Sequence, residues 1–223
     1  MRLGIWNRRK HFHRRTDMNI LRFLGIGMDC LSSMLILTPV TLVILKMSGR
    51  KVKSLHTVVL LLYLCVLSGI YSVTGIPDVR DCSFDLSLNL IPMTDILNSP
   101  QQYLFNVLMF VPVGFLLPLL WDEYRDWKHV MGFCCFLTVF IEVTQVFTFR
   151  TTDIDDLLTN LLGAGIGWLL VSGLVKEYRL RIPFNIDNDY EEAHGQWGYL
   201  IVFLLQQFFL QPYWSAFFWD AIY

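Results

Sequence analysis

The chain has 223 residues, 54% of them hydrophobic, and its mean hydropathy is +0.47. The apolar residues come in uncharged blocks rather than in the alternating pattern of a soluble domain, which indicates an integral membrane protein. The formal net charge is −1, yet basic side chains gather at the N-terminus and in some loops, and carboxylates gather in others. This asymmetry bears on orientation in a membrane, and we expect no nucleic-acid partner.

The five cysteines predict neither a disulfide framework nor a metal site. Cys30, Cys65, Cys134 and Cys135 fall within apolar runs, where they serve as small hydrophobic residues, and Cys82 lies in a long loop. The chain has no Cys-x-x-Cys pair and no His and Cys residues at zinc-ligand spacing. We therefore expect no metal and no cofactor.

The N-terminal segment is basic and precedes an apolar run. Residues 1–22 carry seven Lys and Arg side chains, a pattern that favours a cytoplasmic anchor at the lipid surface over a nucleic-acid arm. The run at 23–45 is too long for the apolar region of a signal peptide, so we expect no cleavage. It contains Asp29 and Pro39, which favour a re-entrant or surface-lying segment over a simple span.

Further apolar runs come next in chain order, separated by loops and turns. They lie at 55–76, 103–121, 129–149, 157–175 and 199–219. Their length predicts an all-α fold, a polytopic membrane helical bundle of five to six hydrophobic segments. We divide the chain into a basic tail with an extra hydrophobic segment at 1–54, a transmembrane core at 55–175, and a loop with a C-terminal transmembrane helix at 176–223.

The distribution of basic residues predicts an orientation. The loops after the first, third and fifth runs carry four, two and three Lys or Arg residues, whereas those after the second and fourth carry one each. Because cytoplasmic loops are enriched in Lys and Arg, loops 77–101 and 150–156 are expected to be extracytoplasmic. The basic tail fits this orientation only if the first run does not cross the membrane.

Polar side chains interrupt the apolar sequence at the outer ends of three runs. Glu142 and Gln145 lie three residues apart near the end of the fourth run, Asn160 lies one turn into the fifth, and Asn106 lies near the start of the third. At about 1.5 Å per helical residue these four share one layer of the outer leaflet. Isolated polar groups are costly in lipid, so we predict that the four form one contiguous hydrogen-bonded cluster.

The turn after the fourth run carries both charge signs. Arg150, Asp153, Asp155 and Asp156 lie in it, and Asp153, Asp156 and Asn160 share one face of the next helix. Gly163 and Gly167 continue that face in the small-xxx-small spacing that allows transmembrane helices to pack closely. Pro112 and Gly114 in the third run are candidate packing residues of the same kind.

Together these residues resemble the VanZ-like family of membrane proteins over about residues 55 to 175. The match consists of Leu88-Asn-Leu-Ile-Pro92, Asn106 with Phe110, Pro112 and Gly114, Glu142-x-x-Gln145, Thr152-Asp153-x-x-Asp156-x-x-x-Asn160, and Gly163 with Gly167. The resemblance implies a multi-pass protein of the bacterial cell membrane, in a family whose founding member is associated with resistance to the glycopeptide teicoplanin. It supplies no mechanism, and Asp155 stands where the family pattern varies.

One hypothesis for the polar end is a binding or shielding site. An outer-leaflet pocket would recognise the headgroup of a membrane lipid, a lipid-linked cell-wall precursor or a lipoglycopeptide, and so contribute to glycopeptide tolerance. Arg150 would pair with a phosphate or carboxylate, unless it only neutralises Asp153 or Asp156. The candidate ligand-binding residues are Asn106, Glu142, Gln145, Arg150, Asp153, Asp156 and Asn160.

Two other hypotheses use the same residues. In a membrane enzyme acting on a lipid-linked substrate, Glu142 would be the catalytic acid or base, and Glu142, Asp153 and Asp156 could hold Mg²⁺ or Ca²⁺. No His, Ser or Cys nucleophile stands beside a base, which argues against catalysis. In a purely structural scaffold, Thr152 or Asp153 would cap the fifth helix and Glu142 would bond to Asn106.

Overall fold

The computed structural model describes residues 3–47, 54–75, 77–80, 84, 88–89, 100–148, 152–178 and 195–222. Cys82 and Arg150, two residues singled out in the sequence, lie outside these ranges. The described residues form seven α-helices, one short 3₁₀ helix and two strands of two residues each. The fold is therefore an all-α bundle, as the sequence predicts.

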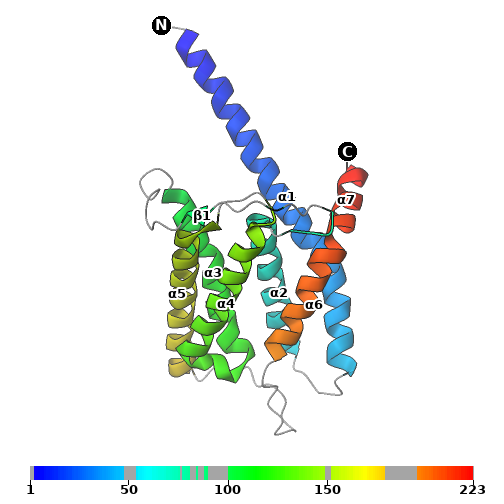
Figure 1. Ribbon diagram of the computed structural model, residues 1–223, viewed down its shortest axis with the longest axis vertical. Helices are drawn as coiled ribbons and strands as arrows, with labels where there is room; N and C mark the ends of the chain where they lie inside the picture. The colour runs from blue at the N-terminus through cyan, green and yellow to red at the C-terminus, as the bar shows by residue number, and fades with distance from the viewer. Residues whose placement is uncertain are drawn as a thin grey trace.

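The first six helices alternate in direction along the chain, and the seventh continues in the direction of the sixth (Figure 1). They are α1 (Leu3–Met47), α2 (Ser54–Thr74), α3 (Pro100–Leu120), α4 (Trp127–Gln145), α5 (Ile154–Tyr178), α6 (Gly195–Phe209) and α7 (Gln211–Ile222). The 3₁₀ helix η1 (Asp122–Arg125) turns the chain between α3 and α4. Among the described residues, five helices are long and apolar enough to cross a membrane, and α6 with α7, bent by 52°, make a sixth candidate.

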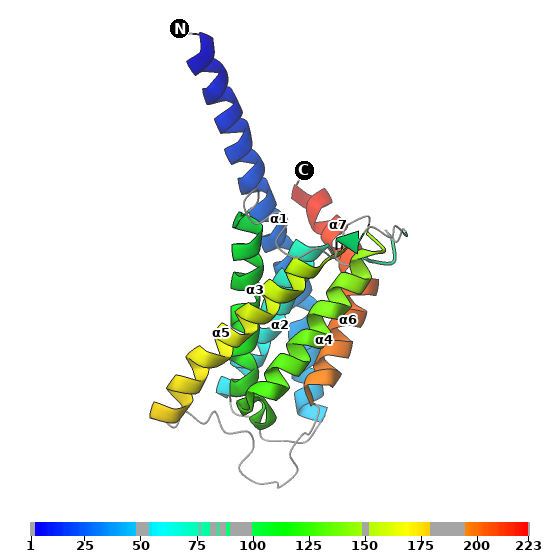
Figure 2. The same ribbon diagram turned by 60° about the vertical axis from the view of Figure 1, so that its left-hand side comes forward.

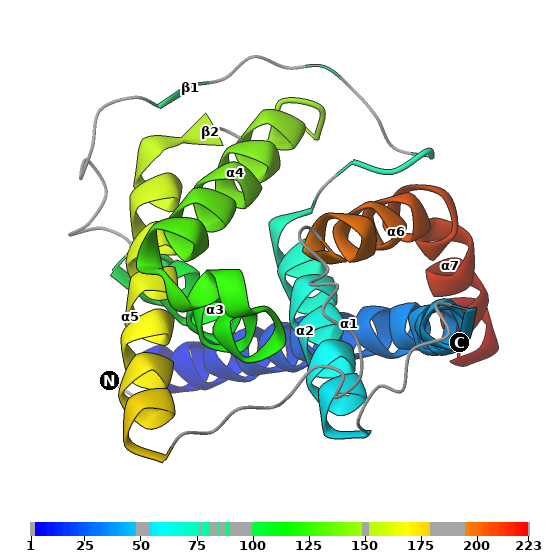
Figure 3. The ribbon, with the colours of Figure 1, turned by 90° about the horizontal axis from the view of Figure 1, so that it is seen from below.

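Helix α2 lies in the middle of the bundle. Figures 1 and 3 show α3, α4 and α5 on one side of it, and the second half of α1 with α6 and α7 on the other. Tyr63 and Leu64 of α2 are fully buried, as are Phe110 and Leu117 of α3. Many large apolar side chains of the same helices point outward instead, as Leu108 does at 53% exposure. Apolar side chains on both faces are what a helix needs when its surroundings are lipid.

Among the described residues, the most extensive helix contact joins α3 to α5, which cross in Figure 2. A Cβ atom on Gly163 or Gly167 would run into the backbone carbonyl of Val107 or Val111, and one on Gly114 would run into the carbonyl of Ala164. Only glycine leaves room for two helix backbones this close. This packing holds the N-terminal end of α5 against the N-terminal half of α3.

Helix α1 corrects the prediction of a re-entrant or surface-lying first segment. It runs as one helix through Asp29 and Pro39, and its part Phe23–Met47 is long and apolar enough to span (Figure 1). The Asp29 side chain is accommodated within the bundle because Ser72 and Ser215 each donate a hydrogen bond to its carboxylate. A polar side chain with partners inside the bundle is compatible with a span.

Because α1 is one continuous helix, it also affects the membrane orientation inferred from the basic residues. The N-terminus lies at the end of the bundle that carries β1 and β2 (Figure 1). Counted along the sequence, half of the 18 Lys and Arg residues then belong to segments at each end of the bundle. With the N-terminal segment included, the count of basic residues favours neither orientation.

Candidate functional site

Two short strands close one end of the bundle. Strand β1 (Leu88–Asn89) pairs in parallel with β2 (Thr152–Asp153), so that Asn89 lies opposite Asp153. The Asn89 side-chain amide also donates to Asp153 Oδ2 over 3.2 Å. This pairing brings the long loop after α2 onto the turn between α4 and α5. This turn contains Asp153, and the first turn of α5 carries Asp156, two of the three carboxylates predicted to line the site.

Glu142 and Asp153 fix the beginning of α5. Glu142 is buried near the end of α4, and its Oε2 accepts a hydrogen bond from the Asp153 backbone N–H over 3.0 Å. Asp153 Oδ1 accepts from the backbone N–H of Asp155 over 2.9 Å, the geometry of a helix N-cap. The capping expected of Asp153 is thus present, whereas Glu142 holds the turn backbone rather than bonding to Asn106.

Two side-chain bonds join α3 to α5 in this layer. The Asn106 amide donates to Asp156 Oδ1 over 2.6 Å, and the Tyr103 hydroxyl donates to Asp155 Oδ2 over 2.5 Å. Tyr103 and Asn106 lie three residues apart, so both project from the same face of α3. The first turns of α3 and α5 are therefore joined by two charge-assisted contacts.

The remaining two predicted residues bond elsewhere. Gln145 Nε2 donates to the Thr74 backbone carbonyl at the end of α2 over 3.2 Å, and Asn160 Nδ2 donates to Thr138 Oγ1 over 2.8 Å. Asn106, Glu142, Gln145 and Asn160 thus share one end of the bundle, but each bonds to a residue outside the group. The prediction of one contiguous cluster of these four is wrong, because helix rotation directs them toward different neighbours.

A pocket of about 670 Å³ opens within this polar layer. Its walls come from the end of α2, the first turns of α3, the end of α4 and the start of α5, and they include Gln102, Phe105, Asn106, Gln145 and Asp156. Gln145 is 5% exposed, and its Oε1 accepts no hydrogen bond within the described part of the chain. A buried amide oxygen without a donor is costly, so a ligand donor or an ordered water would lower the free energy of this pocket.

Sequence reasoning missed several of the polar partners. Asp155 ranked below its neighbours because the family pattern varies there, yet it is 3% exposed and bonded to Tyr103. The position of Tyr103, one turn before Asn106 on the same face, is the signal that could have found it. Thr138 and the Thr74 carbonyl gave no signal, since such groups are common in apolar helices. Arg150 lies outside the described residues.

The carboxylates of this layer do not form a cation site. Within the described ranges no group of three or more His, Cys, Asp or Glu residues could hold a metal ion. Glu142, Asp153 and Asp156, which could hold Mg²⁺ or Ca²⁺ in the enzyme hypothesis, do not make up such a group. The first two face the turn backbone and the third faces Asn106.

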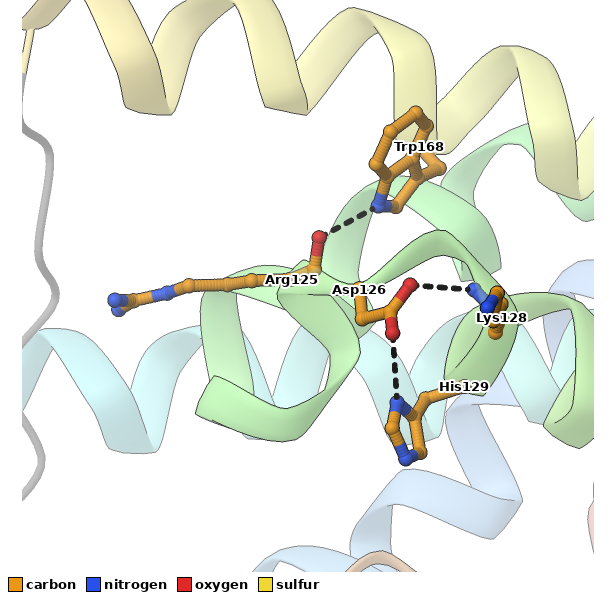
Figure 4. A network of polar contacts seen from close by, with 5 residues as sticks. All are labelled: Arg125, Asp126, Lys128, His129 and Trp168. Carbon is orange, nitrogen blue, oxygen red and sulfur yellow. Dashed lines mark hydrogen bonds and ion pairs between the residues drawn. The ribbon is translucent and has the colours of Figure 1, made fainter.

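The opposite end of the bundle carries polar contacts of a different kind (Figure 4). Asp126 caps α4 by accepting from the Lys128 backbone N–H over 3.1 Å, and its other oxygen lies 3.8 Å from His129 Nδ1. Trp168 of α5 donates to the Arg125 carbonyl over 3.2 Å. These contacts close the turn between α3 and α4 and attach it to α5. Asp126 therefore serves as a control for Asp153, because it caps a helix at the end of the bundle away from the pocket.

The architecture and the polar end define a class: a multi-pass helical membrane protein with a polar pocket at one end of its bundle. The VanZ/LLP1 family model matches residues 30–176. The chain belongs to this family, which confirms the resemblance seen in the sequence. It is 34% identical over 82 residues to Protein VanZ of Enterococcus faecium, covering 36% of this chain and 50% of that protein, so it spans about half the length of this relative. No solved structure matches the chain.

Proposed function

We propose that this protein binds the headgroup of a membrane lipid or of a lipid-linked cell-wall precursor in the pocket between α2, α3, α4 and α5. By holding or shielding that headgroup it would contribute to glycopeptide tolerance. The observation that supports binding best is Gln145, a buried glutamine that lines the pocket with its Oε1 unbonded among the described residues. The site offers a hydrogen-bond acceptor that the described part of the bundle does not satisfy.

The chemistry of the walls indicates the kind of ligand. Asp156 and Gln145 supply acceptor oxygens, and the described residues that line the pocket include no Lys or Arg. Such a pocket suits a ligand that donates hydrogen bonds through hydroxyl, amide or ammonium groups, as sugar and peptide headgroups do. A phosphate or carboxylate of the same ligand would need a separate cation, and Arg150 in the adjacent turn remains our prediction for that contact.

The other polar residues support the pocket. Glu142 and Asp153 order the turn before α5, and Asn160 bonds to Thr138 inside the helix pair. None of these three lines the pocket. We therefore propose binding rather than catalysis, because the candidate acid or base Glu142 is engaged by backbone instead of facing a bound molecule.

We further propose that the pocket faces the outside of the cell. The loops at the opposite end are the basic ones, with four, two and three Lys or Arg residues. The basic N-terminal segment at the pocket end opposes this orientation, so a direct test is needed. A membrane-impermeant maleimide should label Cys82 in intact cells that express the protein. Labelling only after permeabilisation would reverse the orientation and remove the outer-leaflet site.

A matched pair of glutamine variants tests the function. Gln145 and Gln196 are both buried with an Oε1 that has no partner among the described residues, but only Gln145 lines the pocket. In a glycopeptide-susceptible host, expression of the parent protein should raise the teicoplanin concentration needed to stop growth. Gln145→Met should lose this protection at an unchanged membrane level, and Gln196→Met should keep it. Protection by both variants, or by neither, would contradict a pocket-based function.

A further inference from the structure

The second half of α1 and the bent pair α6 and α7 lie together on the other side of α2 (Figures 1 and 3), and a second polar region lies between these helices and α2. It contains a pocket of about 540 Å³. Its walls include Asp29, Ser72, Arg80, Gln207 and Ser215. Helices α6 and α7 lie beyond the residues that the family model matches. This second pocket is separate from the pocket between α2, α3, α4 and α5, and its ligand is inferred independently of the function proposed there.

Asp29 places a carboxylate inside an apolar segment. Ser72 donates to its Oδ2 over 2.7 Å and Ser215 to its Oδ1 over 2.8 Å. Among the described residues no Lys, Arg or His forms an ion pair with it. Two serine hydroxyls satisfy hydrogen bonds but do not neutralise a charge. An acidic side chain in a span is costly without a cationic partner, so the pocket favours a positively charged ligand.

Gln207 is a second and independent sign of a ligand. Its side chain is 1% exposed and lines the pocket, and its Nε2 donates to Ser33 Oγ over 2.8 Å. Its Oε1 accepts no hydrogen bond within the described ranges. The pocket thus combines a carboxylate with a buried acceptor that lacks a donor. A primary ammonium group carries both a positive charge and several N–H donors.

The bend between α6 and α7 places a guanidinium at the same pocket. Pro212 cannot donate to the Phe208 carbonyl, one helical turn before it, and Val79 N–H donates there instead over 3.2 Å. Arg80 Nη1 donates to the Pro212 carbonyl over 2.9 Å, and its guanidinium lies 5.8 Å from the centre of the Tyr213 ring. Arg80 is exposed and keeps further N–H donors for an anion.

We propose that this second pocket binds the phosphoethanolamine headgroup of a zwitterionic phospholipid. The ammonium group would lie against Asp29 and Gln207, and the phosphate would lie against Arg80. The 540 Å³ of the pocket greatly exceed the ~30 Å³ share of one water molecule, which argues for a headgroup rather than a bare ion. The pocket opens among helices that present apolar side chains to lipid, so a lipid is a better source than a soluble amine.

Native mass spectrometry of the full chain in detergent tests this proposal. Phosphatidylethanolamine, phosphatidylcholine and phosphatidylglycerol with identical acyl chains are titrated separately. The parent should bind phosphatidylethanolamine about tenfold more tightly than the other two, because choline has no N–H donor and glycerol has no charge. Asp29→Asn should abolish this preference. Arg80→Gln should weaken all three lipids alike, since each carries a phosphate.

Two control variants keep the result specific. Asp122→Asn makes the same change in an exposed residue at the opposite end of the bundle and should retain the preference. Asp156→Asn alters the first pocket and should also retain it, so the two proposals can fail separately. Equal affinity of the parent for the three lipids, or a preference that survives Asp29→Asn, would overturn the proposal. Competition by soluble O-phosphoethanolamine as strong as by the lipid would overturn the lipid source.

Discussion

The two polar regions on either side of α2 differ in how they are built. The first lies within the residues that the family model matches and depends on four carboxylates fixed by amides, a hydroxyl and backbone N–H groups. The second uses helices α6 and α7 beyond that match, and its walls carry two carboxylates, Asp29 and Asp78, among serines and glutamines. A function common to the family should therefore reside in the first region, and a property particular to this chain in the second.

The largest expected effect on stability concerns the packing of α3 on α5, which belongs to the first region and not to the second. Gly167→Ala would place a Cβ against the Val111 carbonyl, and backbone atoms cannot yield as flexible side chains do. We expect a loss of about 3 kcal/mol or more, or no folded protein in the membrane. Thermal unfolding in detergent measures this loss of stability. The control Gly173→Ala adds a Cβ in the same helix with no atom within 4 Å and should be neutral. Equal stability of both variants would refute the close contact.

A smaller effect should come from the polar bonds of the first region. Asn106→Leu removes the donor to Asp156 and leaves a carboxylate facing an apolar group, at a cost of about 1–3 kcal/mol. Asn160→Leu breaks a neutral bond to Thr138 and should cost less, about 1 kcal/mol. Denaturant titration of both variants shows which one loses more free energy of unfolding. The reverse order would show that Asp156 does not depend on Asn106.

The smallest effect on stability should come from the helix caps. Comparing the two caps also distinguishes a residue that only caps a helix from one that also supports binding. Asp153 and Asp126 each accept from the backbone N–H two residues on, one at each end of the bundle. Replacing either with alanine should cost about 1 kcal/mol. If Asp153 also positions the first pocket, only Asp153→Ala should reduce headgroup binding. Equal loss of binding in Asp126→Ala would mean that binding depends on stability alone.

The sequence predicted the helices and their caps better than the hydrogen-bond partners of the polar side chains. The bundle, the glycine face of α5 and the capping of α5 by Asp153 result from patterns within one helix or turn. The partners of a polar side chain depend on helix rotation and crossing angle, which one sequence does not encode locally. Asn106 faces Asp156 rather than Glu142, although all three lie at one end of the bundle.

The second region could not be predicted from the sequence, because its residues are brought together only by the packing of distant helices. Asp29 counted against a first span because a lone acid is costly in lipid. Its two serine partners lie 43 and 186 residues away in the chain. Scattered serines and glutamines in apolar runs carry no motif, so only the three-dimensional arrangement brings them together.

The measurement that tests the first pocket most directly is the mass of what it binds. Protein extracted gently from bacterial membranes is analysed by native mass spectrometry as the parent, Gln145→Met and Gln196→Met. The parent and Gln196→Met should carry a co-purified lipid or lipid-linked precursor that Gln145→Met has lost, with all three variants folded. The same bound species on Gln145→Met, or none on the parent, would contradict a headgroup site between α2, α3, α4 and α5.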